Sequence, residues 1–146
     1  MKALLQRVRH ARVDVDGECV GEIQQGLLVF LGVERDDDSA RLSKLLERIL
    51  NYRIFADPQG RMNLSLRDTA GGILLVSQFT LAADTSKGRR PGFSTAAPPP
   101  EAEALYEQGL AWLRQHHTAT VTSGQFGADM QVSLTNDGPV TFLLEQ

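Results

Sequence analysis

Gly26-Leu27-Leu28-Val29-Phe30-Leu31-Gly32-Val33 is the stretch around which the rest of the chain is organised. Gly26 breaks the chain, and the residues after it are apolar almost without interruption. A short, continuous apolar run is typical of a strand that is covered on both faces. Before it, the dipeptide Asp16-Gly17 separates two strand patterns and is a strong hairpin signal. We therefore expect this run to be a central strand of a β-sheet.

Further strand patterns lie on both sides of this run. Residues 11–15 alternate apolar and polar side chains, as a half-buried strand does. The other expected strands are residues 3–8, 18–23, 73–76, 118–122, 131–134 and 140–144. Because most of these segments are joined by short turns, we predict a mostly antiparallel sheet.

Two helices are predicted from apolar stripes at helical spacing. The first stripe is Leu42, Leu45, Leu46, Ile49 and Leu50, and the acidic run Asp36-Asp37-Asp38-Ser39 before it suits a helix N-terminus. The second stripe is Ala102, Leu105, Tyr106, Gly109, Trp112 and Leu113, which begins at Glu101 after three prolines and closes at His116-His117. The sequence therefore predicts one α+β domain, residues 1–146, with two principal helices.

Composition excludes several classes of protein. The formal net charge of −3 argues against a broad basic face that coats nucleic acid, although it permits contact with one end of such a partner. Cys19 is the sole cysteine, so an intrachain disulfide or a thiolate metal cluster is excluded. No signal peptide or membrane-length apolar run is visible, and we expect a cytoplasmic protein. The common phosphate-loop, nucleophile-elbow and zinc-protease motifs are absent, and we expect neither metal nor cofactor.

Two short motifs carry the candidate chemistry. Asn136-Asp137-Gly138-Pro139-Val140-Thr141 is a turn signature, in which an X-Pro bond can be cis at modest cost. It is either a tight turn that leads into the last strand or a rigid backbone wall whose carbonyls face a small ligand. Ser77-Gln78-Phe79-Thr80 follows a buried strand, where a sheet holds polar groups rigidly. Those side chains either form a site or satisfy local backbone groups.

Taken together, these two motifs resemble the paired signatures of the D-aminoacyl-tRNA deacylases. The resemblance runs almost end to end and includes Gln6-Arg7-Val8, residues 26–33, Tyr52-Arg53-Ile54-Phe55, Met62-Asn63-Leu64, Lys87-Gly88-Arg89-Arg90-Pro91 and Phe126-Gly127-Ala128-Asp129-Met130. One departure is Pro91-Gly92-Phe93, where the family commonly has Pro-Ser-Phe, so a role for a hydroxyl at position 92 is in doubt. The resemblance implies a barrel-like sheet and a homodimer with active sites at its interface.

The resemblance also implies an activity and its site. The substrate would be tRNA carrying a D-amino acid or glycine, including glycine misattached to tRNA for alanine, and L-aminoacyl-tRNA would be rejected. Gly138-Pro139, with a cis bond and with Asn136, Val140 and Thr141 around it, would be a chirality filter presented to the partner's site. Ser77, Gln78, Phe79 and Thr80 would form the floor that receives the ester. No general base is apparent, which suits a bond as labile as an aminoacyl ester.

The catalytic group has two interpretations. Thr80 is a nucleophile, or the backbone N–H groups of Phe79 and Thr80 act together with the 2′-hydroxyl of the substrate ribose. Lys87, Arg89 and Arg90, in the long irregular stretch 80–100, are either a solvated face or phosphate contacts. Two rival functions remain open, a non-catalytic module that binds RNA ends and a structural dimer whose motifs are packing turns.

Overall fold

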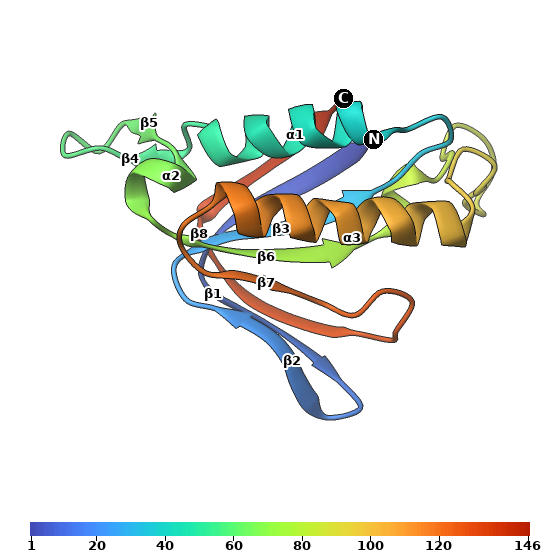
Figure 1. Ribbon diagram of the computed structural model, residues 1–146, viewed down its shortest axis with the longest axis horizontal. Coiled ribbons are helices and arrows are strands. Elements are labelled where there is room, and N and C mark those ends of the chain that lie inside the picture. The colour runs from blue at the N-terminus through green and yellow to red at the C-terminus, as the bar shows by residue number, and fades with distance from the viewer.

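The computed structural model describes residues 1–146 and shows a curved, mixed sheet with two long helices on one side (Figure 1). The elements in chain order are β1 (Lys2–Val15), β2 (Glu18–Ile23), β3 (Gly26–Gly32), α1 (Ser39–Asn51), β4 (Phe55–Ala56), β5 (Met62–Leu64), α2 (Leu66–Thr69), β6 (Gly72–Ser77), the 3₁₀ helix η1 (Phe79–Ala82), α3 (Pro99–His116), β7 (Val121–Ser123) and β8 (Gln131–Glu145). The predicted single α+β domain with two principal helices is confirmed.

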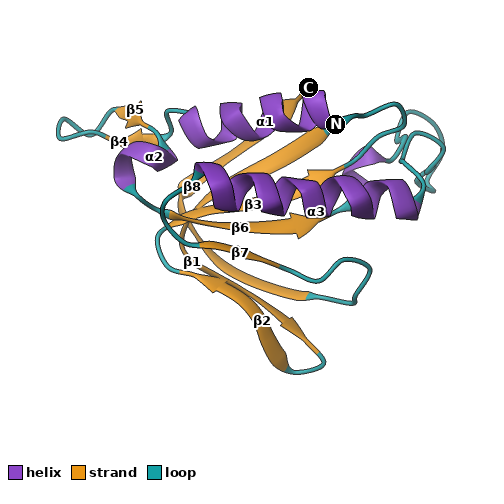
Figure 2. Cartoon of the chain, viewed as in Figure 1, coloured by secondary structure: helices purple, strands orange, loops and turns teal.

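The main sheet has the strand order β2-β1-β3-β6-β7, and β8 pairs with β1 as well (Figure 2). β1 is antiparallel to β2, β3 and β8, whereas β3–β6 and β6–β7 are parallel. The sheet curls until β2 approaches β7, where a Cβ on Gly21 would collide with the carbonyl oxygen of Ser123. Only glycine permits this approach, and it brings the sheet close to a closed barrel.

The core lies on both faces of β3, as its continuous apolar sequence predicts. Leu27, Val29 and Leu31 face the helices in the larger apolar cluster, and Leu28 faces the barrel interior in the smaller one. All five residues of the predicted α1 stripe are buried, together with most of the α3 stripe. Each buried leucine of this kind contributes roughly 1.5–3 kcal/mol. This packing holds the helices rigidly over the sheet.

Two pairs of expected strands are single strands in the structure. Residues 3–8 and 11–15 both belong to β1, and residues 131–134 and 140–144 both belong to β8. The stretch between the β8 halves is therefore a bulge and not a turn that reverses the chain. Asn136 pairs with Val8 and Thr141 with Gln6, so four residues of β8 stand opposite Arg7 alone. The prediction was wrong here because β1 offers a continuous ladder to both halves.

Other expectations need smaller corrections. The strand expected at 118–122 is shorter and lies later in the chain: β7 covers Val121–Ser123, the three residues that pair with β6. The short helix α2 was missed, and Ser65 and Asp68 close its N-terminus by a reciprocal capping box. His117 is the C-cap of α3, as expected, but its side chain is buried, with Nε2 2.7 Å from the carbonyl oxygen of Gly71. The N-terminal cap of α1 is confirmed, since Asp38 accepts a hydrogen bond from the backbone N–H of Arg41 at 2.8 Å.

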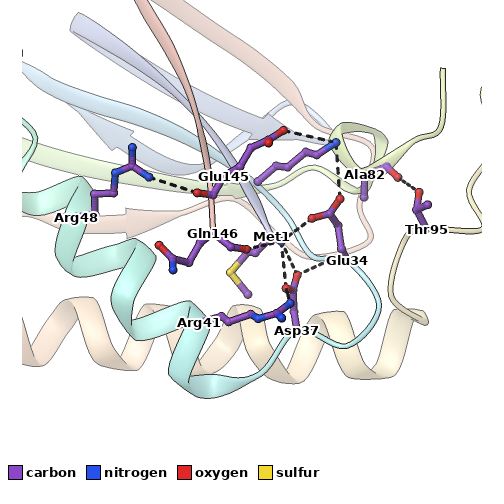
Figure 3. A network of polar contacts seen from close by, with 10 residues as sticks. Met1, Glu34, Asp37, Arg41, Arg48, Ala82, Thr95, Glu145 and Gln146 are labelled. Carbon is purple, nitrogen blue, oxygen red and sulfur yellow. Dashed lines mark hydrogen bonds and ion pairs between the residues drawn. The ribbon is translucent and has the colours of Figure 1, made fainter. Parts of the chain in front are cut away.

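A polar network joins the chain ends to the segment after β3 (Figure 3). The α-ammonium of Met1 donates to Glu34 at 2.5 Å, to Asp37 at 3.1 Å and to the carbonyl of Gln146 at 3.2 Å. Partial burial opposes ionisation of Glu34, yet the hydrogen bond from Met1 lowers its pKa below the usual value. The network anchors residues 34–37 against the sheet. No helix in the structure is long and apolar enough to cross a membrane.

Candidate active site

A cavity of about 640 Å³ opens where β3 and β6 end and α3 begins. Its wall is predominantly apolar and includes Leu31, Val76, Phe126 and Met130. This volume and lining are typical of a site for a small molecule or for one end of a larger one. The polar side chains in the wall are few and include Arg35, Ser77 and Gln78.

Ser77, Gln78 and Phe79 line the cavity, as the sequence motif indicates. Ser77 ends β6, opposite Leu31 in the parallel ladder, and the chain then turns into η1. Phe79 is 59% exposed and Phe93 is 42% exposed, and the centroids of their rings lie 5.1 Å apart. Two accessible aromatic rings at a cavity mouth can stack against a flat ligand.

Thr80 lies beside this floor but does not line the cavity. Its hydroxyl accepts a hydrogen bond from the side-chain amide of Gln78 at 2.5 Å and has no other hydrogen-bond partner in the chain. An amide N–H cannot take a proton from a hydroxyl, so the Gln78 side chain is not a base for this group. The backbone N–H groups of Phe79 and Thr80 lie in the first turn of η1, where no intrahelical acceptor precedes them. Because Phe79 itself lines the cavity, these two backbone donors belong to the segment that forms part of its wall.

The Gly138–Pro139 bulge is held rigidly from within. The Gly138–Pro139 peptide bond is cis, as predicted. Asn136 accepts from the N–H of Val140 at 2.6 Å and donates to the carbonyl of Val140 at 3.1 Å and to the hydroxyl of Thr141 at 3.0 Å. A Cβ on Gly138 would lie 2.6 Å from the backbone nitrogen of Val140, so no larger residue fits. Gly138 and Pro139 are exposed, whereas Val140 is buried.

Arg7 holds the same bulge from the neighbouring strand. Its side chain is only 14% exposed. Its Nε donates to the carbonyl of Asp137 at 2.9 Å, and its Nη1 donates to the carbonyl of Ile54 at 2.7 Å. The contacts of Arg7 could not be predicted from the sequence, because both acceptors are distant from it in the chain.

The two motifs are far apart within one chain. Across the sheet, Asn136 and Thr141 are level with Gly26 and Leu28, whereas Ser77 is level with Leu31. Three strand spacings and about four residues of strand length separate them, which is on the order of 20 Å. No residue of the bulge lines the cavity. The bulge therefore does not reach the cavity of its own chain.

Lys87, Arg89 and Arg90, the loop cations, are exposed and lie outside the cavity. Their loop is closed at its base by a pair of hydrogen bonds between Asp84 and Gly92, at 2.8 and 3.0 Å. None of the three forms an ion pair within the chain, as the full set of ion pairs shows. A Cβ on Gly92 would meet nothing closer than 3.7 Å, so the fold does not require glycine there.

Several cavity residues were missed as site residues by sequence reasoning. These are Arg35, Phe93, Tyr106, Phe126 and Met130. Tyr106 was predicted only as part of the α3 stripe; its hydroxyl donates to the carbonyl of Leu75 at 2.8 Å, and burial raises its pKa to about 12. It therefore stays a neutral donor that positions the end of β6. No group of three His, Cys, Asp or Glu side chains is arranged to hold a metal ion.

Comparisons with known proteins agree with this architecture. Residues 4–145 match the family model described as D-Tyr-tRNA(Tyr) deacylase. The chain is 66% identical to a D-aminoacyl-tRNA deacylase of Stutzerimonas stutzeri and 63% identical to one of Pseudomonas fluorescens, in both cases over 99% of each chain. A solved structure of a c-Myc DNA unwinding element binding protein superposes with a TM-score of 0.96 at 42% identity, covering 100% of this chain and 99% of that one. A probable eukaryotic D-amino acid tRNA deacylase has a TM-score of 0.82 at 21% identity, over 98% of this chain and 97% of that one, which shows the shared fold.

Proposed function

The chain belongs to the D-Tyr-tRNA(Tyr) deacylase family and is a D-aminoacyl-tRNA deacylase, a hydrolase, and from that premise we propose how its site works. It hydrolyses the ester between a D-amino acid and the terminal ribose of tRNA in the cytoplasm. It also accepts glycine, including glycine misattached to tRNA for alanine, and it rejects L-amino acids. The observation that carries this proposal is an exposed, rigid bulge that lies far from the cavity of its own chain.

The cavity receives the terminal adenosine of the tRNA. A purine base has two apolar faces, and the exposed rings of Phe79 and Phe93 offer a surface on which it can stack. The ribose then lies toward Ser77 and Gln78, the polar part of the wall. This placement brings the ester to the start of η1.

Hydrolysis needs little beyond positioning, because the bond is already labile. Water attacks the ester carbonyl carbon, and the N–H groups of Phe79 and Thr80 stabilise the oxyanion that forms. The neighbouring ribose hydroxyl relays a proton to the departing ribose oxygen. Thr80 itself is not the nucleophile in this scheme, because its hydroxyl contacts only the amide of Gln78.

The bulge acts on the partner's cavity in a homodimer. In one chain it lies on the order of 20 Å from Ser77 by strand spacing, yet its backbone is exposed and braced by Arg7 and Asn136. A second copy related by a two-fold axis presents it to the other cavity, and each dimer has two such sites. An L side chain would be driven into this wall, a D side chain would point away, and glycine has nothing to clash. Discrimination thus works by rejection.

The activity is tested with matched substrates on the purified protein. We expect rapid release of D-tyrosine from D-Tyr-tRNA and of glycine from tRNA for glycine and for alanine, with L-Tyr-tRNA spared. Binding of tRNA without release of any amino acid would replace this function with that of a non-catalytic module for RNA ends. Absence of any interaction with an aminoacyl-ribose analogue would favour a purely structural dimer.

The shared site is tested by mixing two inactive variants. Ala128→Trp fills the cavity, and Gly138→Ala distorts the bulge. A heterodimer has one site in which both the cavity and the bulge are intact, and random exchange of equal amounts makes half of the dimers heterodimers, so mixing should restore activity toward about a quarter of the wild-type value. Mass spectrometry of the intact dimers confirms subunit exchange. Complete exchange without recovered activity would refute a site built from two chains.

A further inference from the structure

We propose that Arg35 binds the phosphate that joins the terminal adenosine of the tRNA to the nucleotide before it, an assignment that rests on the proposed function. Arg35 is the only charged residue in the cavity wall. Its side chain is exposed, so an incoming ligand can reach it. A nucleotide is an apolar base joined to one charged group, and the cavity offers an apolar wall with one opposite charge at its edge.

Two contacts hold Arg35 in place. Its backbone N–H donates to the carbonyl of Thr95 at 3.0 Å, and its Nε donates to the carbonyl of Ser94 at 2.5 Å. Its neighbour Glu34 forms a β-bridge with Ala96, which also lines the cavity. The two terminal guanidinium nitrogens have no hydrogen-bond partner within the chain, since the only side-chain contact of Arg35 is through Nε. They form the planar fork that binds phosphate oxygens in pairs.

The charge of Arg35 is not neutralised by the acidic residues around it. Glu34 pairs with Met1 and Lys2. Asp37 pairs with Met1 and Arg41, and Asp38 caps α1. Asp36 has no ion-pair partner, and Arg35 has none either. A free guanidinium beside an apolar cavity is therefore available to an anionic ligand.

The position of Arg35 also fits the path of an RNA strand. Arg35 donates hydrogen bonds to the carbonyl oxygens of Ser94 and Thr95, which follow the loop cations closely in the chain. A strand whose last base occupies the cavity would pass Arg35 first and the loop cations afterwards. Arg35 then binds the last phosphate of the chain, and the loop cations bind those before it.

The test removes the charge from each partner in turn. The substrate is D-Tyr-tRNA in which the last internucleotide phosphate is replaced by a neutral methylphosphonate, compared with the unmodified substrate. We expect wild-type kcat/KM to fall roughly 10- to 100-fold on the methylphosphonate substrate. Arg35→Gln should show the same loss on the unmodified substrate and no further loss on the modified one. Arg35→Lys should keep part of the phosphate effect, because it retains the charge without the fork.

Two controls make the outcome specific. Arg61→Gln removes an exposed arginine beside the β4–β5 turn, outside the cavity, and should behave as wild type. A methylphosphonate in the far part of the acceptor stem should have no effect. If Arg35→Gln lowers activity equally on both substrates, Arg35 only braces the loop through Ser94 and the assignment is wrong. A wild-type enzyme indifferent to the last phosphate also overturns it, whereas no hydrolysis of unmodified D-Tyr-tRNA would refute the proposed function itself.

Discussion

Asn136→Asp is the sharpest probe of the bulge, because it changes one atom of the side chain that holds it. Asn136 makes three hydrogen bonds to Val140 and Thr141, two of them as a donor through Nδ2. The substitution keeps the acceptor oxygen that faces the N–H of Val140. It replaces the donor nitrogen with an oxygen, which then faces the carbonyl of Val140 at close range. Shape is preserved and the Thr141 hydroxyl can turn to donate to the new oxygen, but the hydrogen bond to the carbonyl of Val140 is lost and becomes a repulsion between two acceptors.

The expected magnitude follows from those contacts. The lost hydrogen bond contributes about 1 kcal/mol net, and the repulsion between the two acceptors costs about as much again, so the free energy of unfolding should fall by about 2 kcal/mol. For a chain of this length, that corresponds to a decrease in Tm of roughly 4–8 °C. If the bulge rejects L substrates only in its held conformation, the same free energy limits the loss of rejection. The preference for D over L should therefore fall by up to about 30-fold.

Thermal unfolding followed by circular dichroism, at one fixed protomer concentration, measures the first quantity. Single-turnover release from D-Tyr-tRNA and L-Tyr-tRNA measures the second. Asn63→Asp is the matched control, because it makes the same chemical change where the side chain forms no hydrogen bond, and it should alter neither quantity. An Asn136→Asp protein with wild-type Tm and wild-type preference would refute the view that this side chain holds the filter.

Four further changes separate the roles proposed for the site. Gly138→Ala should abolish the activity, because the new Cβ collides with Val140 and the displaced bulge disables the site; a variant that still deacylates D-Tyr-tRNA in the same release assay would contradict this. Thr80→Val should retain deacylation within about threefold, and a loss of 100-fold or more in a folded variant would make the hydroxyl a catalytic group. Alanine at all three loop cations should reduce the salt dependence of tRNA binding by a slope of about 2 without changing the preference for D, and an unchanged slope would return them to the solvated surface. Gly92→Ser should leave stability and kcat/KM near wild type, since a Cβ there meets no atom closer than 3.7 Å, and a large change in either would show that glycine is needed.

The sequence alone was sufficient wherever the determining interaction is local. The leucine stripe of α1 repeats at the helical period, and Asp38 caps that helix with its own side chain. The run after Gly26 is apolar on both faces, and it is buried on both. The change from buried to polar residues at Ser77-Gln78 likewise marked a candidate site, and both residues line the cavity. Each of these inferences concerns residues within a few positions of one another, where periodicity and capping chemistry operate.

Only the tertiary structure decided how distant segments meet. It joined the two halves of β8 because both lie on the ladder of β1, and it gave Arg7 its acceptors at Asp137 and Ile54. It also brought Arg35 to the cavity wall and placed the Gly138–Pro139 bulge far from that cavity. Hydrophobic periodicity reports which face of an element is buried, but strand register across the sheet determines which residues become neighbours. Partners separated by up to 145 residues are therefore settled by the packing of whole elements, and no local pattern records them.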